Sequence, residues 1–262
     1  MFFSIIIVNY NTKTLLKNCL NSIFVNCQLN DFEVIVVDND SRDGSIEMLD
    51  KNFKDKVKII ANKENIGFGP ANNQGAQIAK GEYLFFLNSD TIIKDDILTL
   101  IKNFLETNSQ VGIVSPCLLL ENGTKQEFAF GNFPTLFNSV FRKIDIKNTN
   151  NNKPREVDWV SGAALIIRKN IFKKVGGFDE NFFMYFEDVD LCKRVWDLGY
   201  KIMILPQFFL VHLGGKSIDI DRQRKKYYYT SQDYFYKKHY GYLVMYLMKF
   251  ARWFFIILYR SR

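Results

Sequence analysis

The sequence predicts an α/β protein with a mostly parallel central sheet, flanking helices and a helical C-terminal tail. Apolar runs and segments of helical periodicity alternate from residue 4 to about residue 106, an order typical of consecutive βαβ units. The connections between them are short. Tyr83 to Leu87 is apolar without alternation, which indicates a strand buried on both faces. The 262 residues suffice for one large domain with a small appendage.

The N-terminal half supplies four strands, each followed by a helix. The strands are expected at residues 4–9, 32–37, 57–61 and 83–87. Thr12 is the candidate N-cap of the first helix, and Asp43-Gly44-Ser45 opens the second. Pro70 suits the first position of the third helix, which should run to Lys80. A fourth helix is expected to begin near Asp95.

The C-terminal half is less regular, yet it returns to apolar strands. These are expected at residues 111–115, 159–167, 200–205 and 208–212. Gly162 would let a ligand or another backbone approach closely. Residues 147–154 are the most linker-like segment and form either a passive surface loop or a loop that orders on substrate binding. We expect a main domain over residues 1–217 and a basic, aromatic helical tail over residues 218–262.

Three of the expected strands end in polar residues, at Asn9-Tyr10-Asn11, Asp38-Asn39-Asp40 and Asn88-Ser89-Asp90. Right-handed crossovers bring these ends to one edge of the sheet, where ligands of open α/β sheets bind. Together with the loop Asn65 to Pro70, they suggest a nucleotide or phosphate pocket. That loop matches neither the dinucleotide nor the P-loop motif. Asp90 could hold a divalent cation there; alternatively, it caps the following helix or shapes the turn.

Three acids, Glu187, Asp188 and Asp190, open a helix that should end at Gly199. Acids in a first helical turn complement the helix dipole, but three in four positions exceed what capping requires. The preceding aromatic run would partly desolvate one carboxyl, raising its pKa and making it a better base. His212 ends an apolar run before a polar loop, and the pattern leaves open whether it is a ligand or a packed residue.

In this order, the motifs resemble the inverting nucleotide-sugar glycosyltransferases of family 2, which have the GT-A fold. The similarity covers about residues 3 to 217. The matching pieces are Val8-Asn9-Tyr10-Asn11, Val37-Asp38-Asn39-Asp40-Ser41, Asn65-Ile66-Gly67-Phe68 through Asn72-Asn73-Gln74-Gly75, Leu87-Asn88-Ser89-Asp90, Gly162-Ala163-Ala164, Gly176-Gly177-Phe178-Asp179-Glu180, Phe186-Glu187-Asp188-Val189-Asp190-Leu191 and His212.

The resemblance implies a role for each of these motifs. Asp38 would contact the nucleobase, and the Asn65 loop would line the donor site. Asp90 would bind Mg²⁺ or Mn²⁺ on the donor diphosphate, with His212 as second ligand, and Asp188 would be the general base. The remaining site residues expected from the motifs are Glu187 (catalytic) and Asn9, Tyr10, Gly67, Asn72 and Asn88 (donor-binding).

The resemblance also bears on the metal and the substrates. Many members carry D-x-D where this chain has Asn88-Ser89-Asp90, so one carboxylate is missing. Bacterial rhamnosyltransferases are similar in this version and in the Phe-Met-Tyr-Phe-Glu-Asp run, which favours a deoxysugar donor such as dTDP-rhamnose. The acceptor would be a hydroxyl of a glycan or of a polyprenyl-linked sugar in cell-surface polysaccharide synthesis.

The charge is concentrated in the tail. The net charge is +7, whereas residues from Lys216 onward carry eleven Lys/Arg against three Asp, so the main domain is close to neutral. Nucleic-acid binding by that domain is therefore not expected, and the tail favours an anionic surface. From Tyr242 to Tyr259 the chain is apolar except for Lys249 and Arg252, which suits a helix lying in a membrane interface; the alternative is a helix docked on the protein itself.

Cysteine usage and the N-terminus indicate the compartment. The four cysteines show no regular spacing and indicate no disulfide framework, and Met1 leads directly into a strand pattern without a secretory signal. We expect a cytoplasmic protein or a peripheral one on the cytoplasmic face of the bacterial inner membrane. Two rival functions are a sugar nucleotidyltransferase, which should carry a Gly-rich basic loop after the first strand, and a non-catalytic nucleotide-sugar-binding protein at the membrane.

Overall fold

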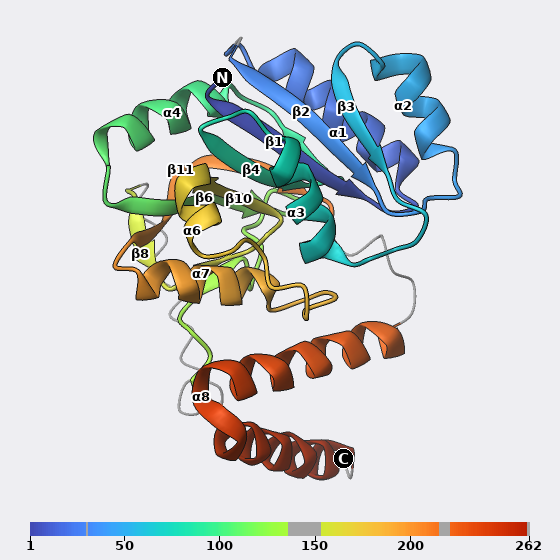
Figure 1. Cartoon of the computed structure of the whole chain (residues 1–262). Coiled ribbons are helices and arrows are strands. Elements are labelled where there is room, and N and C mark those ends of the chain that lie inside the picture. Colours follow the sequence, from blue (N-terminus) through green and yellow to red (C-terminus); the bar gives the residue numbers. More distant parts are fainter. Residues whose placement is uncertain (30, 136–152, 215–220, 261–262) are drawn as a thin grey trace.

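The computed structural model describes residues 1–29, 31–135, 153–214 and 221–260. A mixed sheet crosses the middle of the molecule, with helices on both faces (Figure 1). Its strand order is β3-β2-β1-β4-β10-β6-β11-β5, and β8 pairs with β11. A separate two-stranded sheet joins β7 and β9. The strands are β1 (Phe3–Asn9), β2 (Phe32–Asp38), β3 (Val57–Ala61), β4 (Tyr83–Asn88), β5 (Thr91–Ile93), β6 (Val111–Leu119), β7 (Phe130–Gly131), β8 (Arg155–Val157), β9 (Trp159–Val160), β10 (Ala164–Arg168) and β11 (Lys201–His212).

The mostly parallel sheet expected from the sequence is present. Strands β3, β2, β1 and β4 pair in parallel, as do β6 and β11. Between these two groups lies β10, which runs antiparallel to both β4 and β6. In the central strands both side-chain faces are buried, as in β1 and β4. The polar residues that end β1, β2 and β4 therefore reach the same edge of the sheet.

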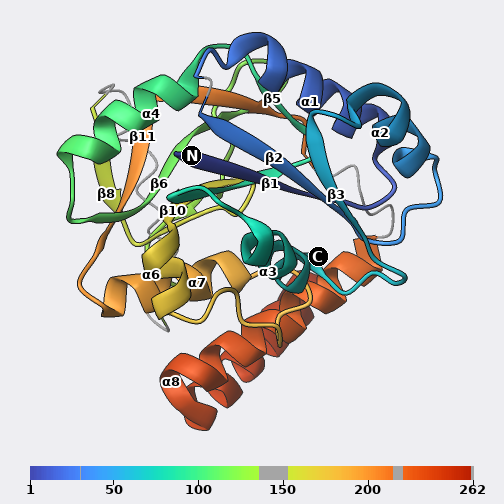
Figure 2. The ribbon, with the colours of Figure 1, turned by 45° about the horizontal axis from the view of Figure 1, so that its top comes forward.

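The helices divide between the two faces of the sheet (Figure 2). One face packs against α1 (Lys13–Asn26), α2 (Ser45–Phe53) and α4 (Ile97–Thr107), with Phe3, Ile5 and Ile7 of β1 among the core residues. The other face packs against α3 (Phe68–Ile78), α6 (Lys169–Lys174) and α7 (Glu187–Asp197), with Ile6 in the core. Because successive side chains of β1 point to opposite faces of the sheet, this strand contributes residues to two separate apolar cores. All four cysteines are free.

Two expected strands have different limits in the structure. The apolar run at residues 159–167 is divided into β9 and β10, because Gly162 and Ala163 use backbone groups to bind Asp188 and Asn88 rather than to extend a ladder. The runs at 200–205 and 208–212 form one strand, β11, whose pairing with β6 is irregular between Leu205 and Phe209, where Pro206 has no N–H to donate.

The region after β4 also differs from the expectation. Thr91–Ile93 forms a short strand, β5, that pairs with the end of β11. Helix α4 begins at Ile97 with Asp96 at its N-cap, so the alternative that Asp90 caps this helix is wrong. Thr12 occupies the N-cap position of α1, as expected, but its side chain makes no capping hydrogen bond. Most of the linker-like segment at 147–154 lies outside the described residues.

The C-terminal helix α8 (Asp221–Arg260) has two arms joined at Gly241, whose φ of 86° and ψ of 172° are not helical. The first arm, residues 221–240, packs on the main domain through Phe235, which is fully buried in the core that contains α7. The second arm, residues 242–260, turns back beneath the first (Figure 1) and covers Tyr236 with Met245 and Met248. The alternative expectation, a tail helix docked on the protein itself, therefore holds for the first arm and for one side of the second arm.

Within the part of the chain that the structure describes, no helix combines the length and the apolarity that crossing a membrane requires.

Candidate active site

A cavity of about 900 Å³ opens at the edge of the sheet where β1, β2 and β4 end. Its volume falls in the range of small-molecule sites. The N-terminus of α7 and the first arm of α8 close its other side. Seven of the site residues predicted from the sequence line it, namely Tyr10, Asn65, Asn88, Asp90, Glu187, Asp188 and His212. Residues 90 and 188, almost a hundred positions apart, thus face one common cavity.

Four other predicted donor-binding residues lie beside the cavity rather than in its lining. Asn9 and Asp38 are buried and joined by a 2.7 Å hydrogen bond from Asn9 Nδ2 to Asp38 Oδ2. Thr12 donates to Asn9 Oδ1, and the Ser41 N–H donates to Asp38 Oδ1. This network fixes the ends of β1 and β2. Asn72 is also buried and donates to the Phe68 carbonyl.

Gly67 holds the loop after β3 against the loop that precedes α7. Its φ of 94° belongs to the region that favours glycine, and a Cβ there would lie 2.6 Å from the Phe183 carbonyl oxygen. The next residue, Phe68, donates its N–H to that same oxygen. At Gly162, where we expected a ligand or another backbone, the close neighbour is instead a side chain: the Phe68 ring would lie 3.1 Å from an added Cβ.

Asp90 and His212 meet in the lining of the cavity. Asp90 follows β4, and His212 ends β11, opposite Thr91 of β5. His212 Nε2 lies 3.1 Å from Asp90 Oδ1, and both side chains are nearly buried. His212 Nδ1 lies 2.7 Å from Gln126 Oε1, so this amide oxygen can accept a hydrogen bond from the ring and fix its orientation. Together the two side chains offer a carboxylate oxygen and an imidazole nitrogen as possible ligands of a metal ion.

Asp90 and His212 alone cannot complete the coordination of a metal ion. No group of three or more His, Cys, Asp or Glu side chains that could hold a metal occurs among the described residues. A hexacoordinate cation bound at Asp90 and His212 would need ligands from diphosphate oxygens and water, which is how Mg²⁺ is commonly held in phosphate-using enzymes. The chemistry of the pair therefore fits a cation that arrives with a substrate diphosphate.

The turn before α7 brings Glu187 and Asp188 into the lining of the same cavity. Tyr185 and Phe186 have φ values of 68° and 65°, a left-handed conformation that costs bulky residues free energy. Packing of both rings against Tyr228 of α8 retains it. As a result, α7 begins at the cavity wall with Glu187 and Asp188 in its first turn.

Asp188 has the environment of a carboxylate base. Its Oδ2 accepts the Gly162 N–H at 2.8 Å, and its Oδ1 accepts the Val189 N–H at 2.8 Å. Removal from water raises the pKa of Asp188, and these backbone donors offset part of the rise. A carboxylate with a raised pKa takes up a proton more readily near neutral pH.

Glu187 is more deeply buried, and its Oε2 has no hydrogen-bond partner within the described part of the chain. Burial raises the pKa of Glu187 well above its ordinary value, and the adjacent Asp188 and Asp190 charges raise it further. The two carboxyl groups are adjacent and buried, so a charge on either one disfavours ionisation of the other.

Asp190, the third acid of the motif, faces away from the cavity and joins α7 to α8. It is fully buried and contacts Arg194, Lys238 and His239 at 2.6 to 2.8 Å. Burial alone would raise the pKa of Asp190, but the His239 hydrogen bond and the Arg194 and Lys238 charges hold it below its usual range.

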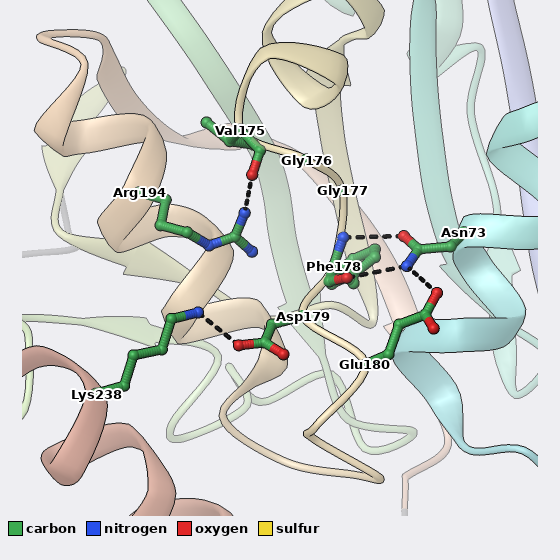
Figure 3. A pocket seen from close by; sticks show the side chains of 9 residues that line it. All are labelled: Asn73, Val175, Gly176, Gly177, Phe178, Asp179, Glu180, Arg194 and Lys238. Carbon is green, nitrogen blue, oxygen red and sulfur yellow. Dashed lines mark hydrogen bonds and ion pairs between the residues drawn. The ribbon is translucent and has the colours of Figure 1, made fainter.

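A smaller pocket lies beside this joint, and Figure 3 shows its lining. There Lys238 reaches Asp179 from α8, and Arg194 donates to the Val175 carbonyl. Asn73 of α3 bonds both the N–H and the carbonyl of Phe178. The Gly176–Glu180 motif and the preceding Val175 therefore tie α3, α7 and α8 together instead of lining the large cavity.

Several lining residues were missed by sequence reasoning. They are Asn39, Ser89, Gln126, Phe128, Asn132, Pro134, Trp159, Ser161, Arg224, Tyr228 and Gln232. Asn39 and Ser89 lie within motifs that had been singled out, so strand-end position could have found them. Gln126 lies in a stretch without periodicity, and the α8 residues were assigned to a tail; neither group carries a sequence signal for the site.

Comparison with known families identifies this arrangement. Residues 4–176 match the family described as Glycosyl transferase family 2. The chain belongs to glycosyl transferase family 2. This confirms the resemblance drawn from the motifs. Residues 142–214 also match a family described as the N-terminal domain of galactosyltransferase.

Curated relatives of this family 2 chain include several rhamnosyltransferases. The rhamnosyltransferase WbbL of Escherichia coli is 31% identical over 161 residues, covering 56% of this chain and 60% of the relative. The dTDP-rhamnosyl transferase RfbF of Shigella flexneri is 26% identical over 220 residues, covering 82% and 70%. The hexosyltransferase Agl10 of Haloferax volcanii is 31% identical over 201 residues, covering 73% and 60%. The matches thus span about 60% of the length of WbbL and Agl10.

Solved structures show that this family 2 chain has the GT-A fold. The structure of GalNAc-T7 with UDP, GalNAc and Mn²⁺ superposes with a TM-score of 0.68 at 19% identity, covering 90% of this chain and 50% of that one. Residues 1–349 of S. aureus TarS superpose with a TM-score of 0.63 at 20% identity, covering 89% and 64%. The predicted fold class is therefore confirmed.

Proposed function

We propose that this protein transfers a sugar from a nucleotide-diphosphate donor to an acceptor hydroxyl, with inversion at the anomeric carbon. One observation carries the proposal: the Asp90–His212 pair and Asp188 line a single cavity. The pair suits a diphosphate leaving group, and Asp188 suits an attacking hydroxyl. The rhamnosyltransferases among the relatives favour dTDP-rhamnose as the donor.

In this proposal, Asp90 and His212 would hold the divalent cation that accompanies the donor diphosphate. Bound Mn²⁺ or Mg²⁺ supplies Lewis-acid stabilisation of the charge that develops on the leaving diphosphate. Gln126 fixes the ring of His212, and Asn88, 3.4 Å from Nε2, borders the same pair. Tyr10, Asn39 and Asn65 form the neighbouring wall for the nucleoside.

Asp188 takes the proton from the acceptor hydroxyl as that oxygen attacks the anomeric carbon. The bond from the anomeric carbon to the diphosphate breaks on the opposite face, and the electron pair leaves with the diphosphate. The backbone N–H groups of Gly162 and Val189 fix both carboxylate oxygens, so Asp188 is oriented before the acceptor arrives. General-base help of this kind is worth roughly 10² to 10⁴ in rate.

Replacement of Asp188 tests this assignment. Asp188→Asn keeps the size of the side chain and should lower kcat by about 10² to 10⁴ while donor affinity stays within about twofold. Asp197→Asn, an exposed change at the far end of α7, is the control. Wild-type turnover in Asp188→Asn, with a donor confirmed by thermal shift, would refute the role of Asp188.

We propose further that the acceptor is lipid-linked and that the second arm of α8 rests on the cytoplasmic membrane surface. Tyr246, Phe250 and Trp253 are each about 60% exposed, while Lys249 and Arg252 turn to Asp233 of the first arm. The charges that would oppose burial in an apolar layer are thereby paired on the protein side. The relatives include an N-acetylglucosaminyl-diphospho-decaprenol L-rhamnosyltransferase of Mycobacterium tuberculosis, 42% identical over 67 residues, which cover 26% of this chain and 22% of the relative.

Vesicle flotation tests the membrane contact. Replacing Phe250 and Trp253 by serine removes exposed rings that contact each other, and it should abolish binding to vesicles containing phosphatidylglycerol. Val25→Ser, at a site that is 77% exposed on α1, is the control and should bind as wild type. Unchanged flotation of the double variant would remove the second arm as the membrane contact.

A further inference from the structure

One face of the first arm of α8 forms a wall of the large cavity. Arg224, Tyr228 and Gln232 all line it, and they are spaced four residues apart, so they lie on one face of the helix. This stripe belongs to the segment that sequence analysis assigned to a separate tail. The boundary at residue 217 therefore runs through the walls of the site.

The stripe lies on the acid side of the cavity. The Tyr228 ring packs edge-on against Tyr185 and Phe186 at centroid distances of 5.8 and 5.3 Å, and these two residues directly precede Glu187 and Asp188. The donor side is instead built from the ends of β1, β2 and β4. A group that touches Tyr228 would thus lie on the side from which the acceptor reaches Asp188.

The stripe offers a specific chemistry to a ligand. Tyr228 remains 42% exposed despite its ring contacts, so part of its surface is open to the cavity. Arg224 is half-buried, and its charge acts on Tyr185, where it offsets part of the rise that burial causes in the pKa of that hydroxyl. Guanidinium groups bind phosphate oxygens in a bidentate manner, whereas the acids nearby would repel an anion unless such a cation stood between them.

The second arm braces this wall. Arg252 donates to Gln232 Oε1 at 2.8 Å and to Asp233 at 2.9 Å, and its guanidinium lies 4.5 Å from the centre of the Tyr229 ring. The second arm carries the exposed aromatic side chains and, through Arg252, also holds Gln232. It therefore connects those aromatic side chains directly to the cavity wall.

We propose that Arg224, Tyr228 and Gln232 form the acceptor-binding wall and that Arg224 binds a phosphate group adjoining the acceptor sugar. This inference rests on the transferase function proposed above, because it assumes that a second substrate enters beside Asp188. The phosphate is part of the diphosphate that links the sugar to the lipid in the acceptor proposed above. A phosphate within a polymer would present the same chemistry to Arg224.

Binding of matched probes tests the inference without requiring turnover. Calorimetry would compare decyl-diphospho-N-acetylglucosamine with the neutral decyl N-acetylglucosaminide, with the donor side filled by a nucleoside diphosphate and Mn²⁺. Wild type should bind the diphosphate probe about 10- to 100-fold more tightly, the range of one hydrogen-bonded charge pair. Arg224→Gln should lose this preference, whereas Lys226→Gln, an exposed change two positions along α8, should keep it.

Two more measurements separate the components of the proposal. Tyr228→Ala should weaken both probes equally, because its ring contacts the sugar, and an unchanged affinity for both would overturn its role. N-acetylglucosamine 1-phosphate, which lacks a chain, should retain an Arg224-dependent advantage over N-acetylglucosamine; its loss would overturn phosphate recognition by Arg224. A protein that passes these tests but transfers no sugar would refute the proposed function and leave the assignment of the wall standing.

Discussion

The joint between α7 and α8 at Asp190 provides a quantitative prediction. Its carboxylate is fully buried and contacts three cationic or potentially cationic side chains, Arg194, Lys238 and His239. Asp190→Asn removes the negative charge and leaves these groups facing a neutral amide. Breaking a buried ion pair on one side typically costs about 3–5 kcal/mol of unfolding free energy, a large share of the about 5–15 kcal/mol that a domain possesses.

The assay is urea unfolding followed by circular dichroism, with the thermal midpoint as a second readout. For a chain of this size, a loss of about 3–5 kcal/mol corresponds to a midpoint lower by roughly 6–20 °C. Asp197→Asn on the same helix is the matched control, because Asp197 pairs with Lys193 at the surface and is 46% exposed. An exposed pair of this kind is worth about 0–1 kcal/mol.

The pH dependence carries a sign that can be checked. The pKa of Asp190 is lowered in the folded protein, so its contribution is fully present above the carboxyl pKa of the unfolded chain. It is lost as the pH falls through the lowered value. The stability gap between wild type and Asp190→Asn should therefore persist at neutral pH and shrink in acid. A variant that unfolds within about 1 kcal/mol of Asp197→Asn at pH 7 would refute the reasoning.

Three further predictions concern the cavity. Asp90→Asn should weaken donor binding in the presence of Mn²⁺ but leave the weaker binding in EDTA unchanged, as measured by calorimetry; equal affinities for variant and wild type in Mn²⁺ would contradict a metal role. Gly67→Ala should cost at least about 1–3 kcal/mol in thermal unfolding, because it combines a positive φ with a 2.6 Å contact to the Phe183 carbonyl; an unchanged midpoint would disprove the close packing of these loops. Because burial raises the pKa of Asp188 and the base must be deprotonated, kcat/KM should rise with pH along an acidic limb centred above the ordinary Asp value of about 3.9; a limb centred below that value would contradict Asp188 as the base.

The sequence was informative where apolar residues recur in a regular pattern and where polar residues end a strand. Unbroken apolar runs predicted β1, β2 and β4, and the polar residues after them led to Asp90. It was less informative where tertiary pairing decides the outcome. Nothing local distinguishes β10 as an antiparallel strand, and Thr91–Ile93 is a strand only because β11 pairs with it.

The site was predicted from its acids but not from its walls. The carboxylates stand out because charged groups are rare beside apolar runs, whereas the pattern left the role of His212 open and only the family resemblance implied that it is a ligand. The stripe on α8 carries no such contrast, since Arg224 and Tyr228 lie within a run of basic and aromatic residues. Only the docking of the first arm, through the buried Phe235, brings that stripe to the cavity.

The position of β10 in the middle of the sheet has a consequence for synthesis on the ribosome. The edge of β4 that β10 later covers is complete at Asn88, while its partner ends at Arg168. At about 5–20 residues per second, the apolar edge of a nascent four-stranded sheet remains open for roughly 4–16 s. During that interval it can pair with other chains, so we expect chaperone dependence to peak when ribosomes translate the segment between these two strands.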